Sequence, residues 1–102
     1  MNAMTHIFIR AITTSFSAST EKEVTTAIQE LLNNAGVFEI IFSPLAAYWK
    51  STEQGELLCQ IRTDLPLDTI QKLFADTWEA DTADIQWSNI YLPASSFLWI
   101  SA

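Results

Sequence analysis

The sequence contains very few of the residues that build disulfide frameworks or metal sites. Its single cysteine, Cys59, cannot form a disulfide within the chain. Cys59 lies in the apolar segment LLCQI, which predicts a small buried side chain rather than a reactive thiol. The only histidine is His6, whereas a zinc site needs several His or Cys side chains at short spacing. We therefore expect neither a metal site nor a cofactor.

Glycine and positively charged residues are also scarce. The only glycines, Gly36 and Gly55, lie too far apart for a glycine-rich phosphate loop. Five Lys and Arg residues stand against 12 Asp and Glu residues, which gives a net charge of −7. Because nucleic acids and anionic membranes attract Lys and Arg, this excess of acid argues against both as direct partners. It suits a basic protein partner instead, since opposite charges accelerate encounter.

Long hydrophobic runs are missing as well. No segment approaches the roughly 20 apolar residues that span a membrane, and Arg10 interrupts the first apolar run, IFIRAI. No basic leader precedes that run, so we expect a cytoplasmic protein, with Met4 as the natural start after residues 1–3. A length of 102 residues with 49% hydrophobic residues predicts one folded domain, residues 1–102.

The apolar pattern predicts a strand followed by an amphipathic helix in the first third of the chain. Residues 5–13 alternate in the manner of a strand. Its two predicted faces carry Ile7, Ile9 and Ala11 on one side and His6, Phe8, Arg10 and Ile12 on the other. The segment T-E-K-E predicts a helix start, with Thr20 as N-cap and Glu23 completing a capping box. Apolar residues at helical spacing follow as far as Gly36, which is expected to cap the C-terminus.

The remaining pattern repeats this arrangement. Residues 37–43 and 56–63 are predicted strands, with TEQG at 52–55 as a turn between extended segments. A second helix is expected from a cap at Asp64 or a neighbour, with Pro66 in its first turn, through Trp78. Strands are expected to follow at 85–92 and 96–101. The order β-α-β-β-α-β with an extra C-terminal strand predicts an α+β fold. Specifically, we expect a two-layer ferredoxin-like sandwich with both helices on one face of an antiparallel sheet.

Two groups of acidic and aromatic residues are the candidate binding site. In the segment DTWEADTADIQW, acids accompany Trp78 and Trp87 without any basic residue. Carboxylates at the end of the second helix would oppose its macrodipole, which favours a role in binding over a plain solvated helix end. Aromatic side chains supply desolvated contact area, and acids steer and pair with Lys or Arg. The candidate partner-binding residues are Asp76, Trp78, Glu79, Asp81, Asp84, Trp87 and Tyr91, together with Tyr48, Trp49 and the acids predicted to flank the turn, Glu53 and Glu56.

Catalytic constellations are not apparent in the sequence. A Ser-His-Asp or Cys-His set would have to use His6, which stands next to no nucleophile motif. Paired carboxylates in a polar connection should titrate near their ordinary pKa values, so they make poor acid–base pairs. We therefore expect a binding protein rather than an enzyme.

The size, acidity and element order resemble those of bacterial immunity proteins. The resemblance rests on THIFIRAITTSFSAST, on the acidic segment around Trp78 and on WSNIYLPASSFLWISA. It is to the immunity proteins of contact-dependent growth inhibition and other polymorphic toxin systems. This resemblance implies tight binding to a cognate toxin domain, often a basic nuclease, and coverage of its active site by acidic side chains.

Two alternatives stay open. A dimeric ferredoxin-like protein, either a ligand-binding protein or a small enzyme, could enclose a small molecule or haem in a pocket lined by Trp, Phe and His6. A structural or regulatory subunit could instead use its aromatic face for self-association. In the immunity interpretation the free protein is expected to be a monomer or a homodimer.

Overall fold

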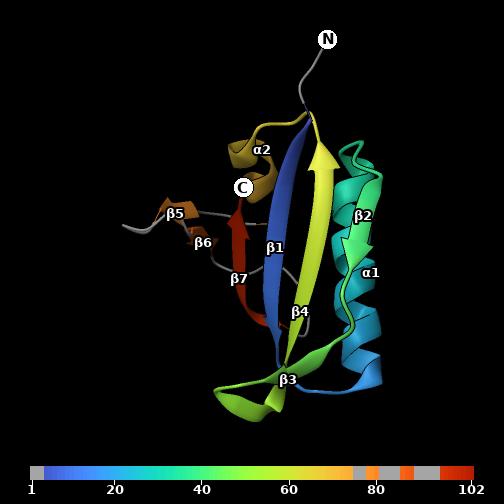
Figure 1. Cartoon of the computed structure of the whole chain (residues 1–102), viewed down its shortest axis with the longest axis vertical. Helices are drawn as coiled ribbons and strands as arrows, with labels where there is room; N and C mark the ends of the chain where they lie inside the picture. The colour runs from blue at the N-terminus through green and yellow to red at the C-terminus, as the bar shows by residue number, and fades with distance from the viewer. Residues whose placement is uncertain (1–3, 75–77, 81–85, 89–94) are drawn as a thin grey trace.

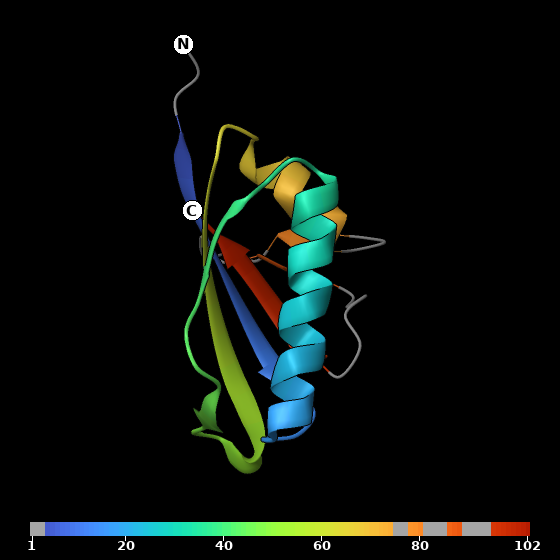
Figure 2. The same cartoon turned by 90° about the vertical axis from the view of Figure 1, so that its right-hand side faces the viewer.

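The computed structural model describes residues 4–74, 78–80, 86–88 and 95–102, with backbone only at 78–80, 86–88 and 95–97. Two helices lie on one face of a twisted sheet, and the other face is free of helices (Figures 1 and 2). The elements in chain order are β1 (Thr5–Thr13), α1 (Ala18–Asn34), β2 (Glu39–Phe42), β3 (Ala46–Tyr48), β4 (Ser51–Thr63), α2 (Leu67–Leu73), β5 (Trp78–Ala80), β6 (Gln86–Ser88) and β7 (Ser95–Ser101).

All seven strands within the described residues belong to a single sheet. Its order is β2-β4-β1-β7-β6-β5, with β3 also paired to β4, and every pairing is antiparallel. The 13-residue β4 organises the sheet, because it pairs with β1 along one edge and with β2 and β3 along the other. The predicted α+β class, antiparallel sheet and two helices are confirmed.

The core lies between the helices and the sheet. The burial of β1 alternates as predicted, with Ile7 and Ile9 buried beneath the helices and His6 and Phe8 exposed on the other side. Strands β4 and β7 present the same alternation, which follows from the two-residue period of a strand. The buried cluster is completed by Ala11, Val24, Ile28, Leu32, Val37, Leu57, Cys59, Ile61, Ile70, Phe74, Leu98 and Ile100.

Helix α1 begins three residues before the predicted start. Ser17, not Thr20, is the N-cap, and its hydroxyl oxygen accepts a hydrogen bond from the Thr20 N–H at 3.3 Å. Thr20 is buried, and its hydroxyl bonds to that of Ser15 at 2.6 Å. Several hydroxyl side chains in SFSAST can cap a helix, so the local pattern alone did not single out Ser17. Gly36 adopts φ +85° just beyond the helix, in agreement with its predicted role as a cap.

The predicted turn at TEQG is wrong. These residues belong to β4, and the chain reverses instead at Trp49 and Lys50. Gly55 marks a close approach within the strand, because a Cβ there would lie 2.7 Å from both Leu45 Cδ1 and Thr13 Oγ1. The Gly55 N–H also donates to Thr13 Oγ1 at 3.0 Å. A glycine inside a strand can therefore indicate crowding rather than a turn.

Helix α2 is shorter than predicted. It is preceded by Pro66 rather than capped by Asp64, and it ends at Leu73. Its buried Gln71 donates through Nε2 to the carbonyl oxygen of Ile100 at 3.4 Å, which ties α2 to β7. Trp78 lies in β5, so its helical spacing was misleading, since tryptophan suits strands equally well. Within the part of the chain that the structure describes, neither helix has the length and hydropathy needed to cross a membrane.

Candidate partner-binding face

The side of the sheet that carries no helix presents both apolar and charged side chains. In Figure 1 this side faces the reader. Phe8, Ile41 and Leu58 expose 45%, 67% and 46% of their surface there, which is unusual for large apolar residues so close together. We call this surface the helix-free face and define it by the outward residues His6, Phe8, Arg10, Glu39, Ile41, Glu56, Leu58, Gln60, Arg62 and Trp99.

Arg10 occupies the middle of the helix-free face. In the sheet register it stands between Leu58 of β4 and Trp99 of β7. Its guanidinium carbon lies 4.8 Å from the centre of the Trp99 ring and 6.0 Å from that of Tyr48, both within cation–π range. Arg10 Nε also donates to Glu56 Oε2 at 2.5 Å. The cationic side chain is therefore held in place, and its charge is balanced.

The β3–β4 hairpin bends toward the helix-free side at one end of the sheet (Figure 2). Tyr48 in this hairpin is buried, and Ile12 is fully buried although it belongs to the outward side of β1 and lies outside the main core. The hairpin end of the sheet therefore has buried apolar side chains outside the main core. Trp49 contacts Tyr48 edge-on at 6.0 Å between ring centres but stays 75% exposed.

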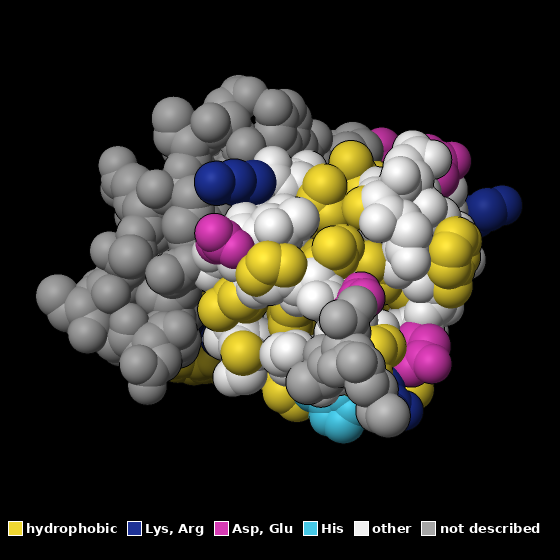
Figure 3. All heavy atoms as spheres, turned by 90° about the horizontal axis from the view of Figure 1, so that it is seen from above, with side chains coloured by type: hydrophobic (Ala, Val, Ile, Leu, Met, Phe, Trp, Pro, Cys, Tyr) yellow, Lys and Arg dark blue, Asp and Glu magenta, His cyan; other side chains and the backbone are white. Residues whose placement is uncertain are grey.

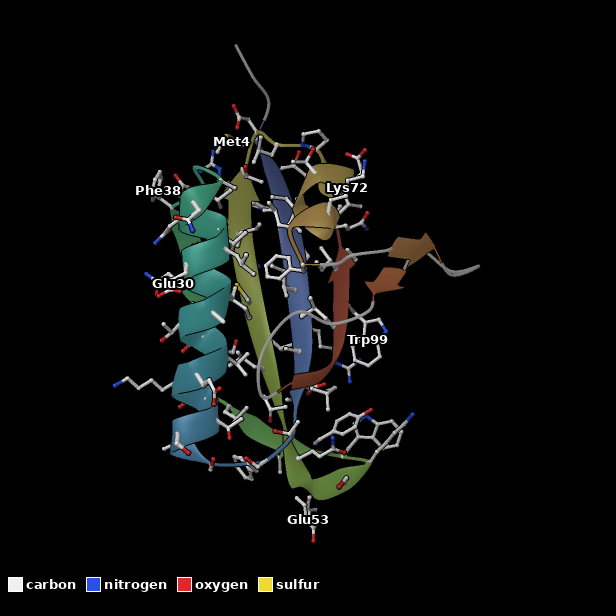
Figure 4. The ribbon with its side chains drawn as sticks, turned by 180° about the vertical axis from the view of Figure 1, so that it is seen from behind. Met4, Glu30, Phe38, Glu53, Lys72 and Trp99 are labelled. Atoms are coloured by element: carbon white, nitrogen blue, oxygen red, sulfur yellow. The ribbon has the colours of Figure 1, made fainter. Side chains whose placement is uncertain are left out.

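The two acids of the predicted hairpin group have different surroundings. Both lie inside β4 and do not flank the turn, because the turn falls at Trp49 and Lys50. Glu56 is half-buried by its pairing with Arg10, whereas Glu53 projects from the far end of the molecule (Figure 4). Trp49 and Glu53 are both exposed, with Lys50 Nζ 5.0 Å from the centre of the Trp49 ring, and Tyr48 and Glu56 support Arg10.

Strand register links the two predicted acid–aromatic groups across the sheet. Glu79 of β5 pairs with Trp87 of β6, and Trp87 pairs with Trp99 of β7, which in turn pairs with Arg10. The backbone of Glu79 is thus three strand spacings from Arg10, or roughly 14 Å. Arg10 and Trp99 were not among the predicted site residues, although an arginine on the outward side of an apolar strand can indicate a site.

Other predicted site residues cannot be placed on this surface. Asp76, Asp81, Asp84 and Tyr91 lie outside the described residues, and Trp78, Glu79 and Trp87 are described by backbone alone. Glu79 belongs to β5 and not to the second helix, so the prediction that it opposes the dipole of that helix is wrong.

Two shallow depressions lie on the helix-free face. One, of about 420 Å³, lies among Phe8, Arg10, Ile41, Leu58 and Trp99. The other, of about 570 Å³, adjoins it at the β2 edge beside His6 and Phe38, where Arg62 Nε and Glu39 Oε2 are 3.9 Å apart. Both are partly open to solvent.

Reactive groups are not concentrated in the described part of the molecule. No three His, Cys, Asp or Glu side chains among the described residues lie close enough to hold a metal ion. Cys59 is buried as predicted, and desolvation raises the pKa of its thiol to about 12, so the thiol stays protonated and unreactive. In the view from above, acidic and basic side chains are interspersed with hydrophobic ones (Figure 3).

Comparison with known proteins identified no similar protein. No family model matches the chain, and searches of curated proteins and of solved structures gave no significant match.

Proposed function

We propose that this chain is a cytoplasmic immunity-type protein that binds and neutralises a cognate basic toxin domain of the nuclease class, without being an enzyme itself. The contact surface comprises the β3–β4 hairpin, the Arg10–Trp99 pair and the acid–aromatic segment of β5 and β6. The observation that carries this proposal is the strand register that joins Glu79, Trp87, Trp99 and Arg10 in one row across the sheet.

The long strands support a ferredoxin-like arrangement as part of this proposal. Strands β2, β4, β1 and β7 are consecutive neighbours, α1 connects β1 to β2, and α2 follows β4. We propose on this basis a split β-α-β fold in which β5 and β6 are an insertion before the last strand. In such a fold the helices occupy one face, and the other face is left for a partner.

The charges on and near this surface favour a basic partner. Arg10 and Arg62 each have a carboxylate nearby, so neither leaves an uncompensated positive charge on the helix-free face. Glu53 is exposed at the hairpin, and residues 76–87 add four acids without a base. A toxin that binds nucleic acid carries Lys and Arg where phosphates bind, and carboxylates can occupy those positions. Trp49 would supply the desolvated anchor that such an interface needs.

The proposal is tested by co-expressing the tagged protein with the product of the gene immediately upstream, followed by affinity capture at low and high salt. Trp49→Ala should weaken capture at least tenfold, because an exposed tryptophan at the centre of an interface commonly contributes about 2 kcal/mol or more. Replacing Asp76, Glu79, Asp81 and Asp84 by Asn or Gln should slow association and flatten its salt dependence. Glu30→Gln, on the outer side of α1 (Figure 4), is the matched control and should bind normally.

Failure to capture any basic protein that is toxic when expressed alone would contradict the proposal. Equal affinity for the parent, the Trp49→Ala variant and the acid-neutralised variant would show that another surface binds.

The depression of about 420 Å³ favours one alternative, a dimeric ferredoxin-like protein that binds a small molecule. In that case the purified protein should carry a ligand that native mass spectrometry or visible absorbance detects. A ligand-free preparation that captures a toxin would exclude this alternative.

A further inference from the structure

The apolar centre of the helix-free face lies on adjacent strands. Ile41, Leu58 and Phe8 project from β2, β4 and β1, which are consecutive in the sheet. Each arginine around this centre lies near a carboxylate of opposite charge: Arg10 beside Glu56, and Arg62 near Glu39. This face therefore has no net charge from its Arg and Glu side chains, although the whole chain carries −7.

The charge balance on this face favours a particular partner, a second copy of the same chain. Two copies of a chain with a charge of −7 repel each other, and the repulsion is smallest where the surfaces brought together are neutral. We propose that the helix-free face packs against the same face of a second copy to form a two-fold symmetric dimer. This inference does not rest on the proposed function. Because Arg10 belongs to both contact surfaces, a toxin that binds there would displace the second copy.

The outward residues of β4 are complementary to their own reversed order. They run Glu56, Leu58, Gln60 and Arg62 along the strand. Consider a two-fold axis that lies between the two packed faces, runs perpendicular to the strands and passes at the level of Cys59. It places β4 of one copy antiparallel over β4 of the other, with Arg62 opposite Glu56 and Leu58 opposite Gln60. Both ends of β4 then gain an ion pair between copies, while the apolar centre is covered. Because Arg62 is exposed and long, it can still reach Glu56 when twist rotates two packed sheets by about 30°.

Strand β1 follows the same symmetry. Cys59 pairs with Ile9, so the same axis brings Phe8 of one copy opposite Arg10 of the other, an arrangement that allows a cation–π contact. An alternative two-fold axis would run parallel to the strands, between β4 and β1. It would place β4 of one copy over β1 of the other, so that Arg62 lies opposite His6 and Glu56 lies opposite Ile12. Charge therefore favours the axis that crosses the strands.

The size of the face sets the expected strength of the dimer. Four strands about 4.8 Å apart, with eight paired residues of about 3.4 Å each, cover roughly 19 by 27 Å. This footprint of roughly 500 Å² per copy is below the roughly 800 Å² per partner of a standard interface. We therefore expect a dimer that dissociates in the micromolar range.

Sedimentation equilibrium of the purified chain over a range of micromolar concentrations tests the dimer. Leu58→Asp should stay monomeric throughout, because it places a charge in the apolar centre. Thr26→Asp adds the same charge at an exposed position of α1, on the opposite side of the sheet, and should dimerise like the parent. Circular dichroism confirms that both variants are folded. A monomeric parent, or equal dimerisation of the two variants, overturns the proposal.

A charge exchange tests the register itself. Arg62→Glu alone and Glu56→Lys alone should each weaken the dimer about tenfold or more, because like charges then face each other between copies. A mixture of the two variants should form heterodimers more readily than either variant forms homodimers. In the heterodimer one ion pair keeps its native residues, and the other is restored with its charges exchanged. A mixture that associates no better than its components overturns the antiparallel arrangement. Because no partner protein is present, the result is independent of toxin binding.

Discussion

Replacing Gly55 with alanine would place a methyl group where two side chains leave no room for it. The added Cβ would lie 2.7 Å from Leu45 Cδ1 and from Thr13 Oγ1, and 2.9 Å from Leu45 Cγ. Thr13 is fixed, because it is buried and its hydroxyl accepts from the Gly55 N–H and donates to the Ser15 carbonyl oxygen. Relief must therefore come from movement of Leu45 or of the strand itself.

The expected loss of stability follows from two opposing terms. Overpacking of a closely packed site costs about 1–3 kcal/mol, whereas replacing a glycine restricts the unfolded chain and returns about 0.4–1 kcal/mol. The net loss should be about 1–2 kcal/mol. In a domain of this size, the melting temperature should then fall by roughly 5–15 °C.

Thermal unfolding followed by circular dichroism measures this effect. The double variant Gly55→Ala with Leu45→Ala should lose less stability than the sum of the losses in the two single variants, because shortening Leu45 removes part of the clash. Gly36→Ala is the control: its Cβ meets no heavy atom within 4 Å, and its cost arises only from the φ of +85°. A Gly55→Ala variant as stable as the parent, or strict additivity with Leu45→Ala, would refute the packing argument.

Two further substitutions test local features of the fold. Ser17→Ala should lower the free energy of unfolding by about 1 kcal/mol, because the Thr20 N–H loses its capping acceptor; an unchanged denaturation midpoint would show that another hydroxyl replaces Ser17. The raised pKa of Cys59 predicts that its contribution to stability is complete below pH 9 and is lost as the pH rises toward 12, where the unfolded thiol ionises first. The parent should lose about 1.4 kcal/mol per pH unit in this window relative to Cys59→Ala, and parallel pH profiles of the two proteins would contradict the burial argument.

The parts of the fold that depend on local periodicity could be predicted from the sequence. The alternation in residues 5–13 correctly assigned both faces of β1, and the helical spacing between Val24 and Leu32 identified α1. Features with more than one local interpretation were assigned wrongly. Gly55 was interpreted as a turn residue although it marks a close contact, and Trp78 was included in a helix although it lies in a strand.

The candidate site depends on register, which no local pattern contains. Arg10 and Glu56 are separated by 46 positions in the sequence, and only the pairing of β1 with β4 brings them together. Trp99 reaches Arg10 through the pairing of β7 with β1. The sequence could therefore indicate the acidic and aromatic groups, but not that Arg10 contacts both Glu56 and Trp99.

The position of β1 has a consequence for how the protein forms. Strand β1 is made first, yet one of its two neighbours is β7, the last strand of the described fold. While the chain is being synthesised, the hydrogen-bonding groups on that edge of β1 have no partner until Ser95–Ser101 have emerged. A nascent chain stalled before Ser95 would thus present the open edge of a strand rich in isoleucine, which is the kind of edge that invites aggregation and chaperone binding.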